Sequence, residues 1–131
     1  MTRITFERGH QRWVSFRSEG HSGYAEAGRD IVCAGISAIL QTAILGIQAY
    51  HTNHSSYCIE EGYLECKLQA NPEIETEREV QSIISTAALG CLNIAVQFPD
   101  LVHFQVIGTN HWTSNKVNQP YEFEKLLELI K

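Results

Sequence analysis

A run of twenty residues without a charged side chain, Ile31–Tyr50, constrains the fold of this chain more than any other feature. A run of that length is long enough to span a membrane as a helix. Its polar side chains Ser37, Gln41 and Gln48, and the lack of a flanking aromatic or basic belt, favour another interpretation. We expect a helix that is apolar on most of its faces and buried twice, by its own sheet and by a neighbouring molecule.

The remaining pattern predicts a single domain over residues 1–131, in which residues 108–131 form a C-terminal extension. Apolar–polar alternation predicts strands at residues 3–7, 12–17, 57–60, 63–69 and 101–107. A second long helix is expected to start at Asn71-Pro72 and to end at Pro99, and a short terminal helix is expected at residues 121–130. This order favours an α/β (α+β) fold, with a two-layer domain in which two main helices pack on one mixed sheet.

Composition and charge narrow the functional class. The net charge of −5 argues against nonspecific nucleic-acid binding and is compatible with a basic peptide substrate. The four cysteines contain no C-x-x-C pair, and the amino-terminal residues do not resemble a signal peptide. We therefore expect a cytoplasmic protein with reduced thiols and with no cofactor, metal, membrane or direct nucleic-acid partner.

The segment from Gly20 to Gly35 (GHSGYAEAGRDIVCAG) carries the chemistry. It places a histidine in a glycine-rich loop and a cysteine twelve residues later. A thiol becomes an effective nucleophile when its ionisation is favoured and an acid or base stands nearby. With Asp30 as the N-cap, Cys33 would be the third helical residue, where free N–H groups and the helix dipole favour a thiolate. We predict a cysteine-nucleophile site.

The pattern G-H-S-G-Y-A-x-x-G-x-D-I-V-C-A-G-I-S, from Gly20 to Ser37, resembles the signature of the Prp family, the bacterial ribosomal-processing cysteine proteases. The order of elements resembles that family out to about Ile107, and the tail beyond it looks longer. The resemblance implies a small α/β fold, a homodimer, and a His/Cys pair. It also implies removal of an N-terminal extension from a large-subunit ribosomal protein.

On this resemblance Cys33 is the nucleophile and His21 the general acid/base. The candidate substrate-binding residues are Gly20, Ser22, Gly23, Asp30 and Ser37. Two roles stay open for Asp30: a helix cap, which we favour, or a third catalytic member that orients His21. Ser37 lies one helical turn after Cys33, and either lines the site or is a tolerated polar residue.

The other cysteines and histidines have simpler interpretations. Cys58, Cys66 and Cys91 are expected to be structural, with Cys91 in the core of the second helix. His51 and His54 have H-x-x-H spacing without a further ligand nearby, so solvated loop histidines are expected rather than a zinc site.

Three functional classes follow. The leading one is a cytosolic cysteine endopeptidase that acts on the N-terminal segment of a large-subunit ribosomal protein. The rivals are a non-catalytic module that docks on the ribosome or on that protein, and a thiol redox protein that uses Cys33. The glycines of residues 20–29 also predict a mobile loop that closes when peptide binds.

Overall fold

The computed structural model describes residues 1–20, 27–109, 111–117 and 122–130 of the chain. They form one six-stranded sheet in the order β3-β4-β2-β1-β5-β6. The strands are β1 (Thr2–Gly9), β2 (Arg12–Glu19), β3 (Ser55–Glu60), β4 (Tyr63–Leu68), β5 (Val102–Gly108) and β6 (Trp112–Thr113). β1 and β5 are parallel and the other neighbouring strands are antiparallel, so the expected mixed sheet is confirmed.

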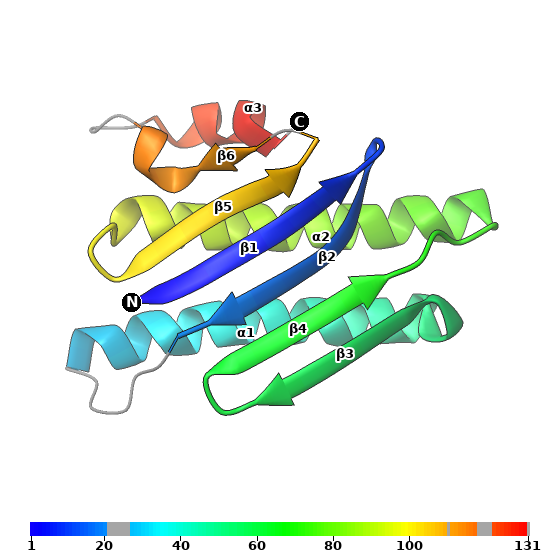
Figure 1. Cartoon of the computed structure of the whole chain (residues 1–131), viewed down its shortest axis with the longest axis horizontal. Coiled ribbons are helices and arrows are strands. Elements are labelled where there is room, and N and C mark those ends of the chain that lie inside the picture. Colours follow the sequence, from blue (N-terminus) through cyan, green and yellow to red (C-terminus); the bar gives the residue numbers. More distant parts are fainter. Residues whose placement is uncertain (21–26, 110, 118–121, 131) are drawn as a thin grey trace.

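Two long helices cover one face of this sheet (Figure 1). They are α1 (Ala27–Tyr50) and α2 (Ile74–Gln97). Strand alternation places large apolar side chains beneath them, with Phe6 stacked on Phe16 at 5.2 Å between ring centroids and 5.6 Å from Phe104. The two-layer architecture expected from the sequence is therefore confirmed.

The uncharged run is buried along one side of α1. Val32, Ile36 and Leu40 lie in the core, whereas Ile31 and Leu45 are 73% and 71% exposed. By length and composition alone, both α1 and α2 are long and apolar enough to cross a membrane. Each buries an apolar stripe on the sheet, as core helices of this length do.

The second helix begins later than the sequence predicts. α2 starts at Ile74 with Glu73 as its N-cap residue, and not at Asn71-Pro72. Asn71 Oδ1 still accepts a hydrogen bond of 2.9 Å from the Glu73 N–H, so the Asn71 side chain caps a turn that precedes the helix.

The segment after Gly108 packs against β5 and α2. It contains β6, the 3₁₀ turns Ser114–Lys116 and Phe123–Lys125, and α3 (Leu126–Ile130). Ser114 Oγ of this segment accepts a hydrogen bond of 3.0 Å from the Phe104 N–H of β5, and Leu126 is buried. The short terminal helix expected at residues 121–130 is present as the 3₁₀ turn Phe123–Lys125 followed by α3, whereas β6 was not expected.

Candidate active site

Cys33 lies on α1, on the side that faces the sheet, and is half-buried. The helix begins at Ala27, so Cys33 is its seventh residue and Asp30 lies inside the first turn. The expected N-cap role of Asp30 and the third helical position of Cys33 are therefore wrong. Only the first four N–H groups of a helix lack an intrahelical partner, so Cys33 lies beyond the free end of the helix.

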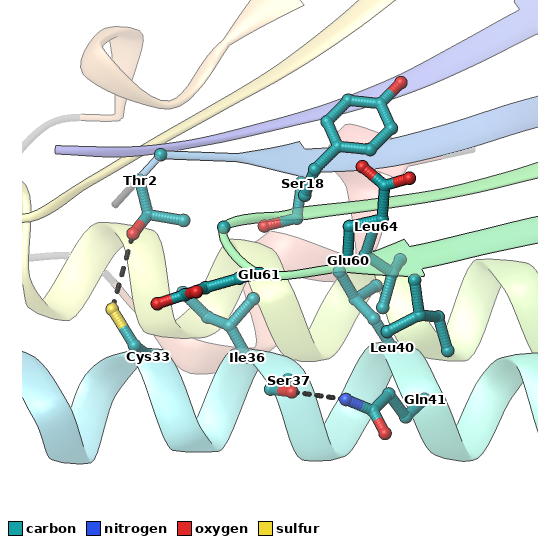
Figure 2. A pocket seen from close by; sticks show the side chains of 14 residues that line it. Thr2, Ser18, Cys33, Ile36, Ser37, Leu40, Gln41, Glu60, Glu61 and Leu64 are labelled. Carbon is teal, nitrogen blue, oxygen red and sulfur yellow. Dashed lines mark hydrogen bonds between the residues drawn. The ribbon is translucent and has the colours of Figure 1, made fainter. Parts of the chain in front are cut away.

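A hydroxyl group from the central strand reaches the thiol instead. Thr2 Oγ1 lies 3.5 Å from Cys33 Sγ, at hydrogen-bond distance for sulfur, and either atom can be the donor. Figure 2 shows the Thr2 side chain extending from β1 toward α1 and its hydroxyl meeting the sulfur.

The thiol lies in a pocket of about 230 Å³ between α1, the ends of β1 and β2, and the turn that joins β3 to β4. The lining residues are Thr2, Ser18, Gly20, Cys33, Ile36, Ser37, Leu40, Gln41, Ile59, Glu60, Glu61, Gly62, Tyr63 and Leu64. Hydroxyls, carboxylates and apolar side chains thus surround a cysteine on one concave surface, which is the setting that a peptide side chain or backbone needs.

Three of the predicted site residues meet in this pocket: Gly20, Cys33 and Ser37. Ser37 Oγ accepts a hydrogen bond of 2.7 Å from Gln41 Nε2, so the hydroxyl that lines the pocket has a partner on its own helix. Asp30 is described only as part of the α1 backbone. The predicted base His21, its neighbours Ser22 and Gly23, and most of the loop expected to close lie outside the described residues.

Gly20 is fixed by its surroundings. Its φ of +129° is a conformation that side-chain-bearing residues rarely adopt. A Cβ here would also collide with Met1 O and lie 2.9 Å from Thr2 Cα. Its N–H donates a hydrogen bond of 3.1 Å to Gly62 O in the turn between β3 and β4, so the residue before His21 is tied to two walls of the pocket.

Sequence reasoning missed Thr2, Ser18 and the 60–62 turn as parts of this site. The available signal was the pattern of the strands. Thr2 lies two residues before Ile4, on the helix-facing side of β1, and Ser18 of β2 is the pairing partner of Ile4. Both residues therefore place a hydroxyl on the side of the sheet that otherwise carries apolar side chains.

The other cysteines divide by position. Cys66 and Cys91 are buried, as expected; burial raises the pKa of Cys66 to about 12 and also raises the pKa of Cys91. Cys58 lies in edge strand β3, so its expected strand position is confirmed, and it is exposed there and not part of the core. Desolvation and the nearby carboxylates of Glu60 and Glu65 raise the pKa of the Cys58 thiol, which disfavours its thiolate.

His51 is not a solvated loop residue, because it is 1% exposed. Its Nε2 lies 3.0 Å from Gln69 O, and its Nδ1 lies 3.1 Å from Asn71 Nδ2. A carbonyl only accepts, so Nε2 carries the hydrogen and Nδ1 accepts from the amide. The ring links the end of α1 to the segment before α2, and no group of three metal-ligating side chains occurs among the described residues.

Comparison with known proteins supports the architecture and shows the family. A family model described as cysteine protease Prp matches residues 1–103. The ribosomal processing cysteine protease Prp of Bacillus subtilis (strain 168) is 40% identical over 45 residues, which are 34% of this chain and only 40% of that protein.

Solved structures match over a longer stretch. SMU.848 from Streptococcus mutans gives a TM-score of 0.70 at 25% identity, covering 82% of this chain and 94% of that one. The essential ribosomal processing protease Prp from S. aureus, in complex with a substrate peptide, gives a TM-score of 0.68 at 19% identity. That match covers 82% of this chain and all of the other. A further structure of the S. aureus protease holds a covalently linked product peptide.

Proposed function

The chain belongs to the cysteine protease Prp family, and from this we propose that it is a cysteine endopeptidase with Cys33 as nucleophile. The observation that carries the proposal is the pocket. It brings the only cysteine of the 20–37 motif to one wall and Gly20, the residue before His21 in the chain, to another. The helix that carries Cys33 and the strand end that leads to His21 in the chain therefore meet at one concave site, which supports the assignment of the two roles.

The proposed reaction is acyl transfer to sulfur. His21 takes the proton of the Cys33 thiol, and the thiolate attacks the peptide carbonyl carbon. As the carbon–nitrogen bond breaks, the His21 imidazolium gives that proton to the leaving amine, which leaves an acyl group on sulfur. Water then attacks the thioester with His21 as base, and the released acid and restored thiol close the cycle.

We propose that the substrate is the N-terminal extension of a large-subunit ribosomal protein, encountered in the cytoplasm. Two relatives bear the name ribosomal processing protease, and the S. aureus one was solved with a substrate peptide. The net charge of −5 suits a basic ribosomal segment. Gly20, Ser37 and Asp30, together with Ser22 and Gly23, are the residues we propose to contact this peptide.

Substitution of the dyad tests the chemistry. Cys33→Ala should abolish cleavage of a peptide spanning the start of the host ribosomal protein, and Cys33→Ser should leave very little. His21→Ala should lower turnover by orders of magnitude with the fold intact. Cys58→Ala, which removes an exposed cysteine that does not line the pocket, should cleave normally.

Substantial cleavage by Cys33→Ala would contradict the nucleophile assignment. A host ribosomal protein that starts without an extension would contradict the substrate and leave the chemistry standing. The rival non-catalytic module predicts that an alkylating peptide-like probe labels Cys33 no faster in the wild type than in His21→Ala. A thiol redox role predicts a mixed disulfide at Cys33, with a resolving thiol beside it.

A further inference from the structure

The side of β1 that faces the helices carries a polar side chain, not an apolar one, next to Cys33. In the middle of β1 this side carries the large apolar residues Ile4 and Phe6, both fully buried. At the strand's start the same side carries Thr2, which is only 8% exposed. A hydroxyl buried at this level needs a partner, and the partner that the structure gives it is Cys33 Sγ at 3.5 Å.

Thr2 is held firmly by its backbone. Its N–H donates a hydrogen bond of 2.9 Å to Leu101 O, and the residue pairs with Val102 of β5. On its other side Gly20 lies so close that a Cβ there would be 2.9 Å from Thr2 Cα. The threonine hydroxyl therefore projects from a rigid strand and not from a loop, as a group that orients a reacting atom should.

We propose that Thr2 is a positioning residue for Cys33. In the resting site the thiol and the hydroxyl share a hydrogen bond that fixes the direction of the sulfur. When the thiol proton passes to the base, the hydroxyl rotates and donates its own hydrogen to the thiolate. This inference rests on the proposed function, in which Cys33 is the nucleophile.

The position of Cys33 makes such a donor useful. Because Cys33 is the seventh residue of α1, free N–H groups at the helix start are not beside the sulfur. Hydrogen bonds to a charged acceptor are stronger than those to a neutral one, so the Thr2 hydroxyl favours the ionised sulfur over the neutral thiol. Thr2 of β1 thus stabilises the Cys33 thiolate, the role that the sequence predicted for the start of the helix.

The test compares Thr2→Val, which keeps the shape and removes the hydroxyl, with Thr2→Ser, which keeps the hydroxyl. Thr5→Val is the matched control, since Thr5 is buried on the opposite face of β1 and its hydroxyl accepts from Gln105 Nε2 at 3.0 Å. The rate of iodoacetamide alkylation of Cys33 is followed by mass spectrometry from pH 5 to pH 10. Intact mass checks that all variants carry the same amino terminus.

We expect Thr2→Val to move the midpoint of the pH–rate profile upward by about one unit, the rough worth of a hydrogen bond to a charged group. Thr2→Ser should restore the wild-type midpoint, and Thr5→Val should leave it unchanged. kcat for peptide cleavage should fall about tenfold in Thr2→Val, with KM little changed.

A purely structural role gives a different result. It predicts the wild-type midpoint in folded Thr2→Val, or a Thr2→Ser profile that matches Thr2→Val, and either outcome overturns the inference. If Thr2→Val does not fold, the Thr2→Ser and Thr2→Ala profiles decide, since only serine retains a donor. Failure of the proposed function shows elsewhere, as cleavage that survives in Cys33→Ala.

Discussion

At the scale of single residues, Glu77 joins the opening hairpin to the second helix. Its Oε1 accepts from Arg12 Nε at 3.1 Å and forms an ion pair with Arg12 Nη2 at 3.0 Å, while its Oε2 accepts from the Asn71 N–H. Gln81, one turn later, donates to Glu77 and pairs its amide with the backbone N–H and carbonyl of Trp13. One carboxylate therefore organises three segments of chain.

This environment determines how Glu77 responds to acid. Partial desolvation raises the pKa of Glu77, but hydrogen bonds from Asn71, Arg12 and Gln81 outweigh it, so the pKa lies below its ordinary value. The pKa is thus lower in the folded chain than in the unfolded one. The stability that the carboxylate contributes is full above the unfolded pKa, about 4.3, and is lost as pH falls through the folded pKa.

We expect Glu77→Gln to lower the free energy of unfolding by about 1 to 2 kcal/mol at pH 7, because it removes a charged acceptor from a partly buried network. The deficit should shrink toward pH 3. Urea unfolding at both pH values measures it, and Glu79→Gln, on the exposed side of the same helix, is the control. A deficit of equal size at pH 7 and pH 3 would contradict the pKa argument.

At the scale of elements, the segment after Gly108 completes the core at the β5 edge. Trp112 meets Phe104 at 6.0 Å between ring centroids, and Leu126 of α3 is 4% exposed beside α2. An uncovered β5 would leave an unpaired edge strand beside an aromatic core. The extension is therefore part of the fold.

Two adjacent leucines on α3 test this directly. Leu126→Ala should cost about 2 to 4 kcal/mol of unfolding free energy, since it empties a buried site. Leu127→Ala should cost less than about 0.5 kcal/mol, because Leu127 is 46% exposed. Equal costs in chemical unfolding would mean that α3 is not docked as described.

Local pattern predicted the elements well, because each strand alternates and each long helix keeps a helical stripe of core residues. It did not predict features that depend on neighbouring segments of the fold. β6 has two residues and no period to detect, and the start of α2 at Ile74 is set by the turn before it and not by the Asn-Pro pair. Cys33 and Ser37 were found because the motif concentrates them. The contact of Thr2 with Cys33 depends on how α1 crosses the sheet, which no local spacing encodes.

At the scale of the whole molecule, α1 leaves apolar surface uncovered. Beside the exposed Ile31 and Leu45, a shallow apolar groove of about 730 Å³ runs between α1 and α2. Its lining residues are Ala38, Ile39, Thr42, Ala43, Gly46, Ser82, Ile83, Thr86, Ala87 and Gly90. We propose that a second copy of the chain covers part of this surface, which gives α1 the second burial that its composition predicts.

Light scattering at micromolar concentration should therefore give the mass of a dimer. Leu45→Glu should shift the protein toward monomer, since it places a charge on the exposed stripe without disturbing the core. Leu127→Glu, the same substitution at an exposed leucine of α3, should leave the dimer intact. A clean monomer mass for the wild type would count against the proposal.

The parallel pairing of β1 with β5 also determines when the contacts around Thr2 can form during synthesis of the chain. Thr5 lies beside Gln105, a hundred positions later, so one edge of β1 stays unpaired until β5 has been made. Until then Thr2 lacks the Leu101 carbonyl that holds its backbone. A growing chain therefore carries both Thr2 and Cys33 long before it carries the segment that holds the Thr2 backbone in place.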